Sequence, residues 1–210
     1  MSTTDLLRSH VLDGTLAPGS RLVELQLAEE YAVSRAAVRT AIGELAKEGL
    51  VDRQANRGAI VRRVALDEAI QITEVRKLLE RLMAARAAEH ATDAERHELR
   101  SIVVAMRAAV EEDRLADYSE LNGVLHRRVR EISHHDIAAD LVANLRNRAA
   151  HHQFRLALIP GRALVSLPQH EAIVDAVVAG DGAAAERAMA DHLDSVVSAL
   201  QQWAEVDRRG

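Results

Sequence analysis

The stretch that decides the fold is "YAVSRAAVRTAIGELAKEGLV", Tyr31–Val51. Its apolar residues recur at helical spacing, and one face of the predicted helix comprises Val38, Ala41, Ile42 and Leu45. The opposite face comprises Arg35, Ala36, Arg39, Thr40 and Gly43. Ser34 is suited to cap the first turn because its hydroxyl can accept from the exposed amides, and Gly49 follows the last turn. The pattern predicts a short helix with one buried and one bare face.

The segments on either side of this helix complete a small domain. Two short helices precede it, the first ended by "DGTLAPGSRL" and the second spanning about Val23 to Tyr31. After Gly49, the β-prone runs "LVDRQ" and "AIVRRV" flank the turn residues of "ANRG". Three helices and a hairpin wing in this order indicate a winged helix-turn-helix, which we place at residues 1–64.

From Asp67 almost to the end, the periodicity is helical. Breaks occur at "HATDAE", "EDRLADY", "SHHD", "LIPGR" and "AGDG", and Thr92 and Glu95 are spaced as a capping box. Five to seven amphipathic helices fit between the breaks, with six to seven preferred, which predicts an antiparallel all-α bundle over residues 65–210. The fold class is therefore mainly α.

Composition narrows the class of protein. Hydrophobic residues make up 48 % of the 210 residues and aromatic residues only 2 %, which favours cores of packed helices. The absence of cysteine excludes disulfides, thiolate metal sites and cysteine nucleophiles. No apolar run is long enough to cross a bilayer, and the start "MSTTDLLRSH" lacks the regions of a signal peptide. We expect a cytoplasmic protein without a membrane partner.

The net charge of −5 does not by itself indicate a nucleic-acid partner. Residues 1–64 hold nine Lys/Arg and eight acidic residues, so their net charge is 9 − 8 = +1. For DNA binding, the direction in which the charged side chains point matters more than the net charge. Arg35 and Arg39 are one turn apart, and on a helix in the major groove they could bind phosphates or guanine edges. The alternative is an ordinary solvated helix face.

The first 64 residues resemble the winged helix-turn-helix of GntR-type bacterial transcription regulators. The shared motifs are the G-x-L-x-P-G turn from Gly14 to Gly19, Leu22, Glu24, Leu27-Ala28, Val33-Ser34-Arg35, Val38-Arg39, Leu45, Glu48-Gly49-Leu50 and Gly58. The resemblance implies DNA contacts by Ser34, Arg35, Arg39 and the wing around Arg57 and Gly58, and Thr40 lies on the same bare face. The family usually has Thr-Pro where this chain has Ala36-Ala37, so the operator sequence of relatives does not transfer.

Histidines in the second domain indicate a metal site. Asn122 and His126 are four residues apart on one helical face, and His170 and His192 lie on later helices whose apolar stripes face the core. Three converging imidazoles would suit zinc, nickel or manganese. The alternative is a set of hydrogen-bonded core or surface histidines. We interpret His134, His135, His151 and His152, which lie near helix breaks, as surface residues.

Most of residues 67–200 resembles the helical effector domain (FCD domain) of the FadR subfamily of these regulators, in "VRKLLERLMAARAAEHAT", "LNGVLHRRV" and "HEAIVDAVVAGDGAAAERAMADHL". Many members hold a divalent metal with an Asp and three His, and the metal helps to bind a small organic acid. The matching positions are Asn122, His126, His170 and His192. Because an amide is a weaker, neutral ligand, the site could bind metal less tightly, use the effector's carboxylate as a ligand, or dispense with metal.

Arg76 and Glu80 have two interpretations. Their i, i+4 spacing suits an ion pair on a solvated helix face. The subfamily's R-x-x-x-E pattern instead implies that Arg76 lies near the effector cavity, where a guanidinium can bind a carboxylate through two hydrogen bonds.

The sequence therefore predicts a ligand-responsive transcription regulator, a repressor that binds a pseudo-palindromic operator as a homodimer and responds to a small organic acid. One alternative is a metal-dependent hydrolytic enzyme. The sequence argues against it, because no carboxylate near His126, His170 or His192 stands in a motif that designates a general base. Glu171 is next to His170, but it would point off the shared face. Another alternative is a constitutive DNA-binding protein whose effector site has degenerated.

Overall fold

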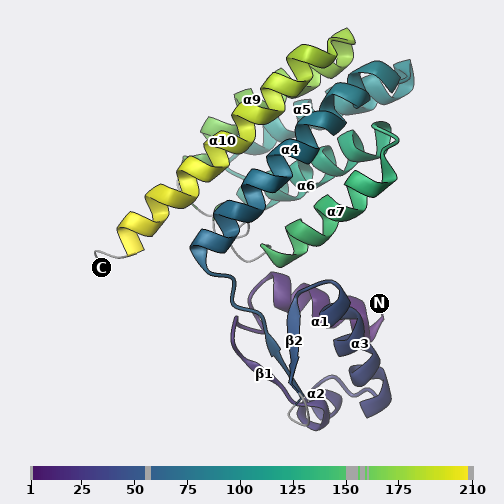
Figure 1. The fold of residues 1–210 in the computed structure, drawn as a ribbon, viewed down its shortest axis with the longest axis vertical. Coiled ribbons are helices and arrows are strands. Elements are labelled where there is room, and N and C mark those ends of the chain that lie inside the picture. Colours follow the sequence, from purple (N-terminus) through teal and green to yellow (C-terminus); the bar gives the residue numbers. More distant parts are fainter. Residues whose placement is uncertain (1, 55–57, 150–155, 157–158, 160, 208–210) are drawn as a thin grey trace. The chain divides into compact units, whose positions relative to one another are not determined.

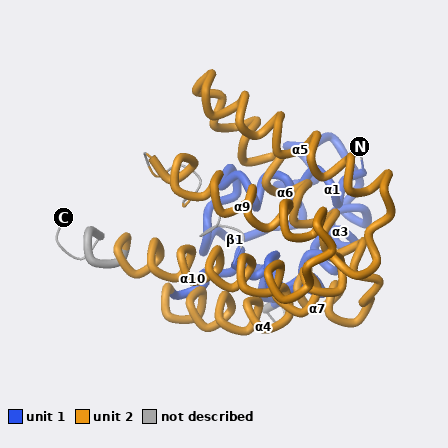
Figure 2. Tube along the Cα trace, turned by 90° about the horizontal axis from the view of Figure 1, so that it is seen from above, with its two compact units in different colours: residues 1–65, 144–154 blue, residues 66–143, 155–210 orange. Residues whose placement is uncertain are grey.

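The computed structural model describes residues 2–54, 58–149, 156, 159 and 161–207. The chain divides into two compact units, which Figure 2 shows in different colours. Unit 1 comprises Met1–Ala65 and Asn144–Phe154, and unit 2 comprises Leu66–Ala143 and Arg155–Gly210.

Unit 1 begins with three helices and a small sheet (Figure 1). Its elements are α1 (Thr3–Leu12), β1 (Arg21–Leu22), α2 (Glu24–Glu30), α3 (Arg35–Lys47), β2 (Val51–Gln54) and β3 (Gly58–Val61). The strand order is β1-β3-β2, and β3 is antiparallel to both neighbours. The predicted helices and hairpin are confirmed. Strand β1 was not predicted, and it turns the wing into a three-stranded sheet.

Helix α3 forms as its sequence predicts. The Ser34 hydroxyl accepts a hydrogen bond from the Ala37 amide at 3.1 Å, which satisfies one of the amides that the first turn leaves exposed. Gly49 follows the helix with a φ of +73°, a conformation that costs glycine little. The predicted apolar face is buried and comprises Val38, Ala41, Ile42 and Leu45. This face packs into the core of unit 1 with Leu7, Leu22 and Leu27, so the other face is left outside.

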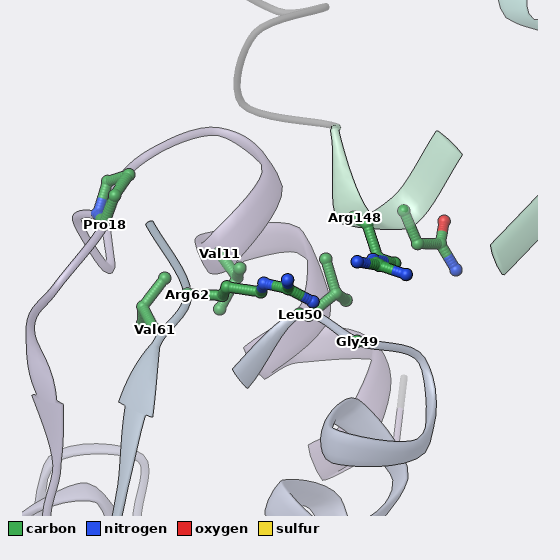
Figure 3. Close-up of a pocket in the computed structure, with 8 residues that line it drawn as sticks. Val11, Pro18, Gly49, Leu50, Val61, Arg62 and Arg148 are labelled. Carbon is green, nitrogen blue, oxygen red and sulfur yellow. The ribbon is translucent and has the colours of Figure 1, made fainter. Parts of the chain in front are cut away.

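Unit 1 also has a hollow, shown in Figure 3. It is lined by Val11, Pro18, Gly49, Leu50, Val61, Arg62, Asn147 and Arg148. None of these lining residues is a histidine, a cysteine or a carboxylate, so the hollow offers neither an imidazole ligand nor a general base.

Unit 2 is built from helices. They are α4 (Leu66–His90), α5 (Asp93–Glu111), α6 (Leu115–Ile132), α7 (Asp136–Arg148), α9 (Arg162–Ala179) and α10 (Gly182–Asp207); the last five residues of α7 belong to unit 1. The predicted capping box of Thr92 and Glu95 is present at the start of α5. Within the described residues, no helix is long and apolar enough to span a membrane.

Helices α4 and α10 are the longest and lie side by side in opposite directions (Figure 1). A Cβ atom on Gly182 would lie 3.2 Å from the carbonyl oxygen of Ala85, so glycine permits the close approach at this end. The core of unit 2 consists mainly of Ala, Leu, Val, Ile and Met. Several polar side chains are nevertheless buried in unit 2: Thr73, Arg76, Glu80, His126, Ser133, Ser166, His170 and His192. Buried polar groups need partners. Six of these eight are connected to one another, directly or through Tyr118: Arg76, Glu80, His126, Ser166, His170 and His192.

Candidate metal centre and DNA-binding surface

Three buried histidines converge inside unit 2. His126 lies on α6, His170 on α9 and His192 on α10, and their exposed fractions are 3 %, 0 % and 4 %. One ring nitrogen from each histidine is available as a ligand, and these three nitrogens all lie within 4.8 Å of one another. The structure therefore brings together the three histidines that the sequence singled out.

Each imidazole is hydrogen-bonded through Nδ1 to a different side chain outside the three histidines. The Nδ1 atom of His126 lies 3.2 Å from a carboxylate oxygen of Glu80, and Nδ1 of His192 lies 3.1 Å from the amide oxygen of Gln169. Both partner oxygens can only accept, so Nδ1–H must donate in both contacts. The remaining Nδ1, on His170, lies 3.1 Å from the hydroxyl of Tyr118.

The Tyr118 contact has a definite direction because it continues to a backbone carbonyl. The Tyr118 hydroxyl lies 2.6 Å from Oγ of Ser166, and that hydroxyl donates to the carbonyl oxygen of Arg162 at 3.0 Å. Since Ser166 uses its proton on the carbonyl, Tyr118 donates to Ser166 and accepts from Nδ1–H of His170. In each neutral ring the lone pair is consequently on Nε2, the nitrogen opposite the outer partner.

Burial keeps the His192 ring neutral. The pKa of His192 is well below its ordinary value, first because burial penalises the charged ring and then because His170 and His126 would add positive charge beside it. Neutral imidazole is the form that binds a metal ion.

Asn122 is the fourth ligand that the resemblance implies. It lies one turn before His126 on α6, and its Oδ1 atom is buried and forms no hydrogen bond within the described chain. Three imidazole nitrogens and one oxygen suit a borderline divalent ion such as zinc. The donor set of the cluster therefore fits the metal that the resemblance implies, although the amide contributes no charge.

The Arg76–Glu80 pair is buried rather than solvated. The Nε and Nη2 atoms of Arg76 lie 2.7 Å and 2.6 Å from the same oxygen of Glu80, and the two side chains are 4 % and 2 % exposed. The solvated-face interpretation of this pair is wrong, because α4 is covered by other helices of unit 2 at these positions. Arg76 is therefore inside unit 2, and its charge is balanced by Glu80.

Two further arginines near the cluster have no such balance. Burial lowers the pKa of both Arg130 and Arg162. Nη1 of Arg130 and Nη2 of Arg162 are buried and make no hydrogen bond within the described residues. Neither arginine was predicted. Tyr118, Asn122, His126 and Arg130 recur every four residues on α6, a spacing that could have revealed Arg130 but not Arg162 of α9.

On unit 1, the bare face of α3 carries the predicted DNA-contact residues. Arg35, Arg39 and Thr40 are exposed, and Ser34 caps the helix. Gly58 begins β3 with a φ of +82°, and a Cβ atom there would lie 2.7 Å from the carbonyl oxygen of Leu22. Arg57, the other predicted wing residue, lies outside the described residues, as does Asn56.

Arg39 is held by an acidic partner that the sequence did not reveal. Its Nε and Nη2 atoms lie 2.9–3.1 Å from the carboxylate of Glu24 on α2. The pKa of Glu24 is lowered, first by these hydrogen bonds and then by the charges of Arg39, Arg35 and Arg53. Three arginines therefore gather around one carboxylate on this surface. Two of them, Arg35 and Arg39, were predicted, and Arg53 of β2 is the third.

Comparison with known proteins identifies the chain. Residues 71–195 match the model of the FCD domain, and residues 2–61 match that of the bacterial regulatory proteins of the gntR family. The chain belongs to the GntR family. This GntR-family protein is 30 % identical over 200 residues to the HTH-type transcriptional repressor RspR of Escherichia coli (strain K12), covering 94 % of the chain and 86 % of RspR. It is 29 % identical over 216 residues to the HTH-type transcriptional regulator LutR of Bacillus subtilis (strain 168), and this match covers 93 % of the chain and 98 % of LutR.

Solved structures share the fold of this GntR-family protein. E. coli McbR/YncC superposes with a TM-score of 0.82 at 21 % identity, covering 96 % of both chains. A putative GntR transcriptional regulator from Rhodococcus sp. RHA1 superposes with a TM-score of 0.75 at 22 % identity, covering 95 % of both chains. The family and the relatives are DNA-binding transcription regulators, so this protein is a regulator and not an enzyme, and the hydrolytic alternative is not favoured.

Proposed function

We propose that this regulator is a homodimeric repressor that binds a pseudo-palindromic operator and responds to a small organic acid bound in unit 2. In this proposal, residues 1–64 bind DNA, and residues 65–210, of the FadR-subfamily type, bind the effector and form the dimer. DNA binding also requires the cytoplasmic location that the sequence leads us to expect. The observation that carries the proposal is the cluster of three buried imidazoles whose Nδ1 atoms are all bonded outward.

The effector site would contain a divalent ion. His126, His170 and His192 would bind it through Nε2, and Oδ1 of Asn122 would occupy a fourth position. The ion would supply a Lewis-acidic position for an acid group of the effector. Glu80, Tyr118 and Gln169 would hold the three rings in the orientation that binding requires.

DNA binding would use the bare face of α3 and the wing. Arg35 and Arg39 would bind phosphates or base edges, with Thr40, the Ser34 cap, Arg57 and Gly58 completing the contact surface. Because much of the affinity would come from phosphate contacts, binding should weaken steeply with salt.

A stripe on α4 supports the homodimer. Val75, Leu78 and Leu82 are 47 %, 60 % and 43 % exposed, and their spacing places them on one side of the helix. Burying this stripe against a second copy would pair two recognition helices for one two-fold symmetric operator.

The effector would act by shifting the equilibrium between two arrangements of the dimer. It can change DNA affinity only through its different affinities for the two arrangements. The neutral Asn122 keeps one alternative open, namely a constitutive DNA-binding protein whose effector site no longer functions.

Elemental analysis of protein purified without an affinity tag or chelator tests the site. The samples are the wild type, His126→Ala, Asn122→Asp and, as a control, His97→Ala, which removes an exposed histidine on α5. We expect near-stoichiometric metal in the wild type and His97→Ala, loss in His126→Ala, and tighter retention in Asn122→Asp. A metal-free wild type would contradict the metal part of the proposal.

Operator binding is measured separately. Duplexes selected from a random-sequence pool by the wild type should be retained by the wild type and bound more weakly by Arg39→Ala. Release of the duplex by a small acid would separate the ligand-responsive repressor from the constitutive DNA-binding protein.

A further inference from the structure

The charges around the histidine cluster do not balance. Glu80 is the buried acidic side chain of unit 2 within the described residues, and its two oxygens already face Arg76 and His126. The three imidazoles and Asn122 contribute no negative charge. Any ion in the cluster would add positive charge, so the excess would increase further.

Arg162 approaches the cluster from the side of α9 and α10. Its Nη1 atom donates to Oγ of Ser195 at 2.7 Å, one helical turn beyond His192. The pKa of His192 is lowered mainly by burial, and the charge of Arg162 adds to this lowering, which places the guanidinium near the cluster. Its Nη2 atom is buried without a hydrogen bond, and no carboxylate of the described chain forms an ion pair with Arg162. A guanidinium in this state lacks an anion.

Arg130 approaches from the side of α6 and α4. It follows His126 by one turn, and its charge interacts favourably with Glu80 and the exposed Glu131 and unfavourably with Arg76 and Arg127. Both carboxylates already have an arginine partner, since Glu80 is hydrogen-bonded to Arg76 and Glu131 is paired with Arg128. Nη1 of Arg130 is left buried without a hydrogen bond in the described structure.

We propose that Arg162 and Arg130 are the anion-binding residues of the effector site, and that the effector carries two acidic groups, as a dicarboxylate does. A guanidinium binds a carboxylate through charge-assisted hydrogen bonds, and a single carboxylate could neutralise only one of the two arginines. Arg76, which the R-x-x-x-E pattern implied as an effector contact, is already paired with Glu80. This inference rests on the proposed function, since it assigns the ligand class of the same site.

Isothermal titration tests the assignment with succinate and malonate as dicarboxylate probes and acetate as the monocarboxylate. The proteins are the wild type, Arg162→Met, Arg162→Lys, Arg130→Met and the control Arg107→Met, whose arginine pairs with Glu171 at the surface of the same unit. We expect at least one dicarboxylate to bind the wild type at least tenfold more tightly than acetate. Each methionine variant of Arg162 and Arg130 should lose at least tenfold in affinity, because a charge-assisted hydrogen bond contributes about 1.5–3 kcal/mol. Arg162→Lys should retain part of the affinity, and Arg107→Met all of it.

Melting of the ligand-free proteins separates binding from folding. Removal of a half-buried charge that has no ion-pair partner in the described chain should leave the melting temperature of Arg162→Met equal to that of the wild type or higher, while the upward shift caused by the dicarboxylate is lost. A purely structural arginine would instead lower the melting temperature on removal.

Three results would overturn the inference: acetate binding as tightly as both dicarboxylates, no dicarboxylate binding at millimolar concentration, or unchanged affinity in Arg162→Met and Arg130→Met. The last two would mean that water alone satisfies the buried nitrogens. Metal content and retention of the selected duplex are measured on the same samples. If metal content and duplex retention are intact while the titrations give one of these three results, only this inference fails. If the duplex is not retained, the proposed function fails.

Discussion

Breaking the buried Arg76–Glu80 pair should destabilise unit 2 strongly, whereas neutralising both members should not. The perturbation is a cycle of Arg76→Met, Glu80→Gln and the double variant. Glutamine is chosen because its side-chain oxygen can still accept from Nδ1–H of His126, so the cycle leaves that contact in place.

The magnitude follows from burial. The nitrogen–oxygen distance is 2.6 Å with side chains 4 % and 2 % exposed, so each single change leaves a charge in the interior without its partner. Such a change costs about 3–5 kcal/mol, whereas removing a buried pair together is often close to neutral. Taking roughly 2–4 °C per kcal/mol, the melting temperature should fall by about 6–20 °C in either single variant and by much less in the double variant.

A surface pair provides the matched control. Arg107 and Glu171 have the same 2.6 Å distance, but their side chains are 53 % and 26 % exposed. Arg107→Met should therefore leave the melting temperature close to that of the wild type. The assay is thermal and urea unfolding followed by circular dichroism.

Two outcomes would refute this reasoning. A cost below about 1 kcal/mol in Arg76→Met would mean that the pair is solvated, as in the simpler interpretation of its spacing. A double variant as unstable as the sum of the singles would mean that the two side chains do not interact.

Four further variants are informative. Ser34→Ala should lower the stability of unit 1 by about 1 kcal/mol in urea unfolding, because the Ala37 amide loses its acceptor. Gly58→Ala should lower the melting temperature, since its φ is +82° and the added carbon meets a backbone oxygen at 2.7 Å, so an unchanged melting temperature would contradict the wing geometry. Tyr118→Phe should weaken metal retention about 10–100-fold in chelator competition by removing the acceptor for His170, while helix content stays the same. Arg39→Ala should reduce affinity for the selected duplex by about 1–3 kcal/mol if Arg39 reads a base, or reduce the salt slope by about 1 if it binds a phosphate.

The winged unit was predictable because its signals are local. The cap at Ser34, the apolar spacing of α3 and the glycine after it all lie within one short stretch, and each was found where predicted. Strand β1 was missed because two residues, Arg21 and Leu22, are too short to show a period. The Glu24–Arg39 pair was missed because spacing along the chain does not show which side chains meet across two helices.

The histidine cluster was partly predictable. Asn122 and His126 share a helix face, but placing His170 and His192 beside them required the resemblance in addition to the apolar stripes. Glu80 illustrates the limit, because an Arg and a Glu four residues apart have the same spacing on a solvated helix as on a buried one. Only the packing of α4 against other helices decides which case applies.

The three histidines come from three separate helices, and this has a consequence for unfolding. A cysteine-free chain has no disulfide to cross-link it, but an ion bound at this site would join positions 126, 170 and 192, closing loops of 170 − 126 = 44 and 192 − 170 = 22 residues. Closing a loop reduces the conformational entropy of the unfolded chain and thereby stabilises the folded unit, by an amount that grows only slowly with loop length. Starvation for the ion would then make unit 2 easier to open and to cleave, so the cell's metal supply would set the lifetime of the regulator as well as its response.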